Sequence, residues 1–227
     1  IVLNRLLSSI NNQVGYDFSK AEILICSSDG KENSFDASLY DKIQPRIKFI
    51  SMQRDYSGPG QSKQIGLDNA RGKYIFFWDC DDSLYAIDTL YKIMNKVHTL
   101  NGSSWDIMLF DYIDEVYGKV YYQLYDTYHI NGWVQWSHLY QTEFLRSHNL
   151  YFKPDIKINE DIYFHSSCIL AGARFLTLPI LVYAHCMMAD STGNNTVYTP
   201  QRLEDNFKVA GDLMNRFNSI NPLISRS

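Results

Sequence analysis

The first half of the chain switches repeatedly between two hydrophobic periods. Apolar residues three and four positions apart predict helices, and short runs rich in β-branched and aromatic residues predict strands. On this basis helices are expected at about 2–12, 36–43, 61–70 and 84–99, and strands at 21–27, 46–51, 73–78 and 105–111. This alternation favours an α/β fold in which helices flank a mostly parallel central sheet.

The pattern loosens after residue 110. A tyrosine-rich stretch at 117–130 predicts one strand followed by an irregular loop. Further on, helices are expected near 137–148, 160–171 and 200–218, with a strand at 175–183 and a Gly/Asn-rich loop at 190–196. A chain of 227 residues is long enough for one sizeable core. We therefore expect a single domain made of two halves, 1–110 and 111–227.

Composition and charge exclude several classes of protein. Apolar residues make up 45% of the chain, and a net charge of −4 leaves no basic surface large enough to bind nucleic acid. The four cysteines are scattered without a C-x-x-C pair, which indicates neither a zinc site nor a disulfide framework. No apolar run reaches the length of a membrane span, and no signal peptide is visible. A cytoplasmic protein is therefore expected.

Candidate chemistry lies where the strand predicted at 73–78 ends. Three carboxylates follow it closely, Asp79, Asp81 and Asp82. Residues two apart in an extended segment point the same way, so the first two can converge on one cation. Their hard oxygen atoms suit Mg²⁺ or Mn²⁺. The alternative is that one of these carboxylates caps the helix predicted at 84–99.

The segment before this cluster points to a known family. Residues 57–72 form a glycine-rich loop and a short helix that lead into the predicted strand. With the acidic cluster, they resemble the family 2 glycosyltransferases of the GT-A fold, a single domain with a Rossmann-like, mostly parallel sheet. Lys63 stands where the family usually has arginine, and Gln64 where it usually has asparagine. The positions that match the family pattern are Gly58, Gly66, Leu67, Ala70, Gly72, Tyr74, Ile75, Asp79, Asp81 and Asp82.

Two other segments extend the resemblance over most of the chain. Ser28 and Asp29 stand where the family has Asp-Asp-Gly-Ser, which implies that Asp29 holds a uracil base; an ordinary turn is the alternative. Glu160 and Asp161 reproduce the family's Glu-Asp-x-x-Phe signature. The resemblance implies that Asp161 is the catalytic base and that Glu160 orients it or the acceptor. Without the other motifs, both carboxylates would be read as complements to a helix dipole.

The same resemblance implies the residues of the donor side. Gly58 and Lys63 would bind the nucleotide sugar, and the alternative for Lys63 is a solvated lysine on the helix surface. Asp81 would be the first ligand of Mn²⁺ or Mg²⁺, while Asp79 would hold the ribose or a metal-bound water. His185 would be a second metal ligand, or else an ordinary half-buried histidine.

The acceptor side is expected in the second half of the chain. The segment that begins at Trp136 resembles the family's Trp-x-Lys-Leu-Tyr helix. Trp136 and Tyr122 are the expected acceptor-binding residues, because sugars stack on aromatic rings. The alternative is that the tyrosines of 117–130 pack half-buried in a strand. Met187 and Met188 stand about where many relatives carry an arginine that helps to neutralise the diphosphate.

Taken together, the resemblance implies an inverting glycosyltransferase that moves a sugar from a UDP-sugar, or another nucleotide sugar, to a saccharide or lipid-linked acceptor. It would serve polysaccharide synthesis for the cell envelope at the inner face of the membrane. The resemblance also implies a strand before residue 1 that supplies part of the base pocket. Two alternatives remain. One is a phosphatase of the haloacid dehalogenase type, with Asp79 as nucleophile and Asp81 as acid/base, and the other is a catalytically silent nucleotide- or carbohydrate-binding module.

Overall fold

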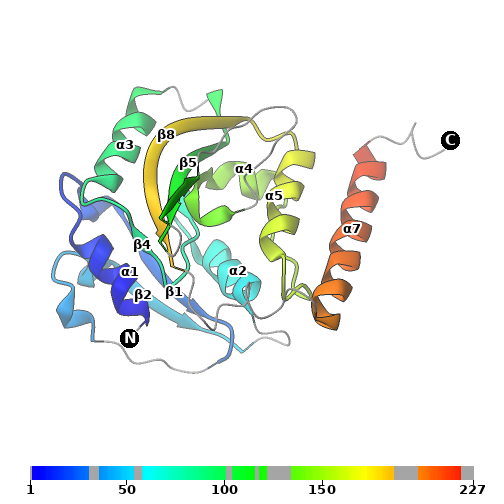
Figure 1. Cartoon of the computed structure of the whole chain (residues 1–227), viewed down its shortest axis with the longest axis horizontal. Helices are drawn as coiled ribbons and strands as arrows, with labels where there is room; N and C mark the ends of the chain where they lie inside the picture. The colour runs from blue at the N-terminus through cyan, green and yellow to red at the C-terminus, as the bar shows by residue number, and fades with distance from the viewer. Residues whose placement is uncertain are drawn as a thin grey trace.

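The computed structural model describes residues 2–30, 36–53, 58–100, 104–115, 118–121, 134–186 and 199–220. Its helices and strands, in chain order, are α1 (Val2–Asn11), β1 (Ile23–Ser27), β2 (Ile47–Ser51), α2 (Pro59–Asn69), β3 (Tyr74–Phe76), β4 (Ser83–Leu84), α3 (Thr89–Thr99), β5 (Ile107–Asp114), β6 (Lys119–Tyr121), β7 (His138–Gln141), α4 (Thr142–Ser147), α5 (Glu160–Leu170), β8 (Phe175–His185) and α7 (Pro200–Ile220). Short 3-10 turns lie at Phe18–Lys20, Ala37–Leu39, Gln44–Arg46 and Gln135–Ser137. These elements form the expected α/β fold (Figure 1).

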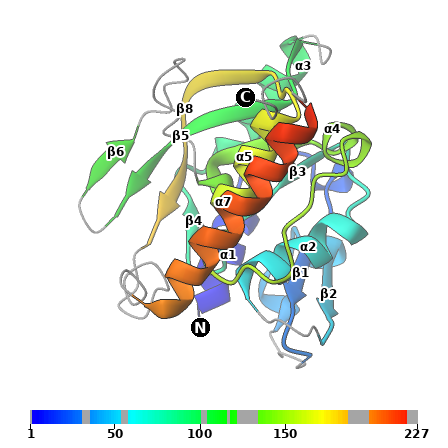
Figure 2. The ribbon, with the colours of Figure 1, turned by 90° about the vertical axis from the view of Figure 1, so that its right-hand side faces the viewer.

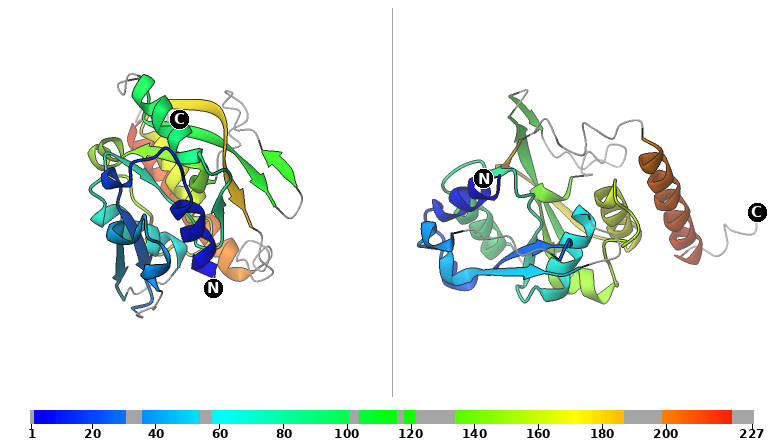
Figure 3. Two further views of the ribbon diagram at one scale, coloured as in Figure 1. Left: turned by 90° about the vertical axis from the view of Figure 1, so that its left-hand side faces the viewer. Right: turned by 90° about the horizontal axis from the view of Figure 1, so that it is seen from below.

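Strand β5 lies inside the larger sheet and separates two hydrophobic cores. Successive side chains of a strand point to opposite faces. Met108 and Phe110 share one core with residues of α1 and α3, whereas Ile107 and Leu109 share the other with residues of α2, α4 and α5. All four side chains are at most 2% exposed. Helices therefore cover both faces of the sheet, as the views from the side and from below show (Figure 3).

The strand pairing is mixed rather than mostly parallel. β1 and β2 form a parallel pair of their own, and the larger sheet has the order β3-β7-β5-β8-β4, with β6 added to β5. Within the larger sheet β5 and β8 are parallel, but the β3–β7, β5–β7, β5–β6 and β4–β8 pairs are antiparallel. β6 returns directly along β5, and β7 runs back between β3 and β5, which makes these pairs antiparallel.

The helix predicted at 84–99 begins later, at Thr89, because β4 takes its first residues into the sheet beside β8. The side chain of Gln13 holds the new helix start. Its Nε2 donates to the carbonyl oxygen of Ala86 over 2.7 Å, and its Oε1 accepts from the backbone nitrogen of Leu90 over 2.9 Å. A residue 77 positions away therefore sets this boundary.

The helix predicted at 137–148 is half strand. Its first part is β7, and only α4 is helical. The side chains of His138, Leu139 and Tyr140 are at most 1% exposed. Ladder pairing with two neighbouring strands, together with this burial, outweighs the helical spacing of the apolar residues. The helix expected at 36–43 is likewise no more than a 3-10 turn.

No ladder hydrogen bond joins β1 to β3 in the described chain, so the sheet is interrupted between them. A cavity of about 1310 Å³ opens at this interruption, and its lining includes Ile23 and Ile25 of β1 and Tyr74 and Phe76 of β3. Glu22 spans the starts of the two strands, because its carboxylate accepts hydrogen bonds from the backbone and side chain of Arg71 and from the Gly72 backbone. The strand expected before residue 1 stays a prediction.

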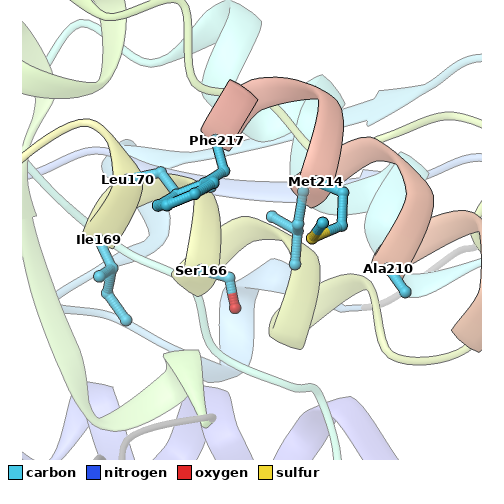
Figure 4. A pocket seen from close by; sticks show the side chains of 7 residues that line it. Ser166, Ile169, Leu170, Ala210, Met214 and Phe217 are labelled. Carbon is cyan, nitrogen blue, oxygen red and sulfur yellow. The ribbon is translucent and has the colours of Figure 1, made fainter. Parts of the chain in front are cut away.

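Helix α7 lies on the outside of the molecule and crosses in front of α5 (Figure 2). An apolar groove of about 420 Å³ runs between the two helices, lined by Leu170 of α5 and by Met214 and Phe217 of α7 (Figure 4). Asp205 of α7 is fully buried, and its Oδ2 accepts from the backbone nitrogens of Lys157 and Ile158. α7 thus fixes the segment that leads into α5. None of the helices in the described ranges is both long and apolar enough to span a bilayer.

Candidate active site

The large cavity at the interruption of the sheet collects most of the predicted site residues. Most of these residues come from four segments of the chain: the turn after β3, the first turn of α5, the middle of α2 and the end of β8. The predicted residues that line the cavity are Lys63, Asp79, Asp81, Trp136, Glu160, Asp161 and His185. Asp29 and Gly58 are not in its lining, and Tyr122, Met187 and Met188 lie outside the described residues.

Ser28 holds the turn that opens α2. Its hydroxyl oxygen accepts from the backbone nitrogen of Gly58 over 3.2 Å and lies 3.3 Å from the Ser62 hydroxyl oxygen. The Ser28 side chain is only 4% exposed. Asp29, the next residue, accepts a hydrogen bond from the Ser27 hydroxyl and pairs through its backbone with Gln53. The sequence shows Ser28 only as a departure from the family pattern. Its contact with Gly58 could not be predicted, because Gly58 lies in a loop 30 positions further along the chain.

Lys63 is not a surface lysine. Its Nζ lies 3.2 Å from Asp79 Oδ1 and 3.2 Å from Glu160 Oε1, and its side chain is only 10% exposed. Burial alone would lower the pKa of Lys63, but the two adjacent carboxylates hold that pKa above its usual value. The ammonium group therefore stays charged and joins α2 to the turn after β3 and to α5.

Asp161 has the electrostatic surroundings of a general base. Burial and the neighbouring Glu160 carboxylate raise its pKa to about 7, against the opposing effects of Lys63 and of a hydrogen bond from the Ile162 backbone nitrogen. That hydrogen bond, 2.8 Å long, places the carboxylate at the helix start, as the dipole interpretation also requires. Asn159, just before the helix, has a left-handed backbone with φ of 67°.

Asp82 fixes the acidic turn and does not cap a helix. It is 1% exposed, and its Oδ1 accepts from the backbone nitrogen of Cys186 over 2.7 Å. Burial raises the pKa of Asp82 to about 6. The backbone nitrogen of Asp79 also donates to the Tyr183 hydroxyl over 3.1 Å. Both contacts tie the turn to the end of β8, and helix α3 begins only at Thr89.

Trp136 and His185 form an aromatic stack at the edge of the cavity. The indole stacks on the His185 ring at a centroid distance of 5.1 Å and on Tyr183 at 4.8 Å. Nδ1 of His185 lies 3.6 Å from Asp114 Oδ2, and the His185 side chain is 28% exposed. Trp136 is itself only 7% exposed, so most of its surface packs against protein. Sequence reasoning missed Asp114, which occupies the last position of β5.

The acidic turn could bind a metal only with help from other ligands. Within the described ranges, no group of three or more His, Cys, Asp or Glu side chains is placed to hold a metal ion. Asp79 and Asp81 nevertheless line the open cavity, with the Asp79 side chain 36% exposed. Two accessible carboxylates suit a cation of the Mg²⁺ type, which takes one or two protein oxygens and completes its shell with water and phosphate.

Comparisons with known proteins identify the family of the chain. A family model described as Glycosyl transferase family 2 matches residues 2–174. The GalNAc(5)-diNAcBac-PP-undecaprenol beta-1,3-glucosyltransferase of Campylobacter jejuni is 34% identical over 101 residues, which are 42% of this chain and 31% of that protein. The poly(ribitol-phosphate) beta-N-acetylglucosaminyltransferase TarS of Staphylococcus aureus is 21% identical over 224 residues, 91% of this chain and 36% of TarS.

Solved structures show the same fold. The crystal structure of S. aureus TarS 1-349 in complex with UDP-GlcNAc has a TM-score of 0.75 at 18% identity, covering 95% of this chain and 62% of that one. The mannosyltransferase PcManGT from Pyrobaculum calidifontis, in complex with GDP-Man and Mn²⁺, has a TM-score of 0.59 at 14% identity, covering 92% and 59%. The fold is therefore of the GT-A type, and the chain spans about a third of the curated relatives it matches. Because the family model covers most of its length, the chain belongs to glycosyl transferase family 2.

Proposed function

We propose that this chain transfers a sugar from a nucleotide sugar, with a UDP-sugar as the favoured donor, to a hydroxyl group of a saccharide or lipid-linked saccharide. The observation that carries the proposal is the single cavity lined by both the acidic turn and the Glu160–Asp161 pair. Complexes of TarS with UDP and with UDP-GlcNAc support the choice of donor. The family assignment also removes the phosphatase alternative.

Asp161 is the proposed catalytic base. As the acceptor oxygen bonds to the anomeric carbon, its proton passes to the Asp161 carboxylate, and the bond from that carbon to the diphosphate breaks with the electron pair on the leaving oxygen. A base works best when its pKa lies near the working pH, which agrees with the value of about 7. One displacement of this kind inverts the anomeric configuration. Glu160 would orient Asp161 or the acceptor.

The donor side would use the acidic turn of the cavity together with two loop residues that lie outside its lining. Gly58 and Asp29 are proposed to meet the nucleotide, and Asp79 the ribose or a metal-bound water, with Lys63 beside it. Asp81, with His185 as a second ligand, would hold Mn²⁺ or Mg²⁺, and such an ion would stabilise the negative charge that develops on the departing diphosphate. The Mn²⁺ in the PcManGT complex supports a divalent ion.

The acceptor side is proposed to include Trp136 and Tyr122. Because Trp136 is largely buried, it would offer the acceptor an edge rather than a full ring face. The lipid-linked name of the Campylobacter relative and the polymer named for TarS support a saccharide or lipid-linked acceptor used in making cell-envelope polysaccharide. A lipid-linked acceptor would bring the chain to the cytoplasmic face of the membrane.

A thermal-shift screen of nucleotides and nucleotide sugars with Mn²⁺ tests the donor. A ligand at ~100 times its Kd stabilises the folded state by about 2.7 kcal/mol, so UDP or a UDP-sugar should give the largest rise in Tm. Transfer is then measured as UDP release in the presence of saccharide acceptors. Equal shifts for all nucleotides would remove the base-reading role of Asp29. UDP binding without any sugar transfer would favour the catalytically silent module.

A further inference from the structure

Lys63 connects the two walls of the cavity through a single ammonium group. It reaches Asp79 in the turn after β3, on the proposed donor side, and Glu160 at the start of α5, beside the proposed base. Both nitrogen–oxygen distances are 3.2 Å, and the side chains of Lys63 and Glu160 are each 10% exposed. Water therefore screens the Lys63–Glu160 contact poorly, and a charge at one end acts strongly on the other.

The packing of α2 against α5 holds this contact in place. A Cβ atom added to Gly60 would lie 3.0 Å from Glu160 Cβ, so glycine at this position lets the first turn of α2 approach Glu160 without a steric conflict. Lys63 follows three positions later and lies on the same helix face. The Lys63–Glu160 distance is thus set by backbone packing and not by a flexible surface side chain.

Two carboxylates and one ammonium group act electrostatically on Asp161. Glu160 on its own helix and Asp79 from the turn after β3 disfavour its ionised form, and Lys63 from α2 favours it. The buried Tyr140 of β7 is near enough that the charge of Asp161 contributes to raising the pKa of the Tyr140 hydroxyl, after the larger effect of burial. Four further cations line the cavity: Lys20, Lys73, Lys157 from the segment before α5 and Arg202 from α7. Lys63 is the cation that contacts both other carboxylates of this set directly.

We propose that Lys63 is a positioning residue of the acceptor side: its ammonium holds Glu160 and stabilises the carboxylate form of Asp161, which receives the acceptor proton. The proposal rests on the transferase function above.

The test is the pH dependence of kcat in Lys63→Met, with Lys63→Arg as the charge-conserving variant and Lys73→Met as the control. Lys73 also lines the cavity, but it lies at the start of β3 with its ammonium 5.3 Å from the Tyr74 ring centre. Loss of an opposite charge at this range moves a carboxylate titration by about 1–3 units. We expect the acid limb of the kcat–pH profile to move to higher pH by about 1–3 units in Lys63→Met and to stay in place in Lys63→Arg and Lys73→Met.

Two further measurements keep the result interpretable. Lys63→Met leaves the buried Glu160 carboxylate without its ammonium partner. The shift of the acid limb is therefore also measured between Glu160→Gln and Lys63→Met/Glu160→Gln, because neither variant contains the unpaired Glu160 charge. Carboxyl ¹³C NMR titration of Asp161 without substrates should show the shift independently of transfer. The proposal would be overturned if neither the acid limb of kcat nor the NMR titration midpoint of Asp161 moved in Lys63→Met. If the wild-type chain transfers no sugar, the proposed function fails, while the NMR comparison still decides the role of Lys63.

Discussion

Asp161 and Glu160 are neighbours in sequence but do different work. Glu160 is bound to Lys63, whereas Asp161 keeps one oxygen for the Ile162 backbone and has a raised pKa of about 7. Burial and the neighbouring Glu160 carboxylate raise the proton affinity of Asp161, while Lys63 binds Glu160. This arrangement is suited to acid–base chemistry near neutral pH.

Asp161→Asn should lower kcat by about 10²–10⁴-fold, because the amide keeps size and hydrogen bonding but cannot take a proton. Donor affinity should stay within a few fold, since the proposed nucleotide site lies at the other wall. Steady-state kinetics and calorimetry with the donor measure the two effects. Glu143→Gln is the matched control, because it removes a carboxylate from the first turn of α4. Wild-type transfer by Asp161→Asn would leave Asp161 as a helix-start carboxylate only.

Asp81→Asn should abolish metal-dependent nucleotide binding while the fold survives, because Asp81 is only partly buried and an amide is a far weaker metal ligand than a carboxylate. Calorimetry with and without EDTA gives the measurement. Asp88→Asn serves as control, since Asp88 is paired with Lys92 at the start of α3. If Mn²⁺ still raises nucleotide affinity in Asp81→Asn as it does in the wild type, another group holds the ion.

Among the elements, those with strong local signals could be predicted and those set by distant contacts could not. Helices α1, α2, α5 and α7 follow the periodic pattern closely. β4 and β7 were missed because pairing with β8, β3 and β5 decides them. The site divides in the same way. Sequence motifs identified Asp79, Asp81, Glu160 and Asp161, and all four line one cavity. The roles of Ser28, Asp82 and Asp114 could not be predicted, because they depend on partners from other parts of the chain.

α7 supports the site from outside through Asp205, which leads to a prediction at this scale. Asp205→Ala removes the acceptor for two backbone nitrogens and should lower the free energy of unfolding by about 2–4 kcal/mol. Because these nitrogens belong to the segment before α5, kcat should also fall. Urea unfolding and transfer assays measure both. Glu204→Ala, which loses only an exposed pair with Lys208, should change neither. Equal effects of the two substitutions would contradict the role given to Asp205.

At the scale of the whole molecule, two buried histidines link stability to pH. His138 and His165 are both 0% exposed, with ring centres 5.3 Å apart. Burial lowers the pKa of His138 well below its usual value and that of His165 to about 4. Since the unfolded chain binds protons at these groups near pH 6.5, the folded state has their full contribution above that pH and loses it as the pH falls.

His165→Leu should therefore flatten the pH dependence of stability. Each buried histidine accounts for a loss of about 2 kcal/mol between pH 7 and pH 5, so the variant should lose that much less than the wild type over this range. The comparison uses the difference between the two pH values, which cancels any packing cost common to both. Urea unfolding gives the free energies. His98→Gln, on the exposed face of α3, is the control and should follow the wild type. Parallel curves for His165→Leu would show that His165 does not contribute.

The interruption between β1 and β3 has a mechanical consequence. A continuous sheet resists shear through every bond of its ladder, but here the two walls of the cavity belong to different sheets. Near the starts of β1 and β3, the Glu22 carboxylate accepts hydrogen bonds from the backbone nitrogens of Arg71 and Gly72. Beyond the end of β3, the ammonium of Lys63 forms ion pairs with Asp79 and Glu160. The width of the cleft is therefore governed by a few polar side chains and by the packing of helices around them. A ligand that competes for Asp79 or Glu160 would therefore act directly on the contacts of Lys63 that join α2 to the turn after β3 and to α5.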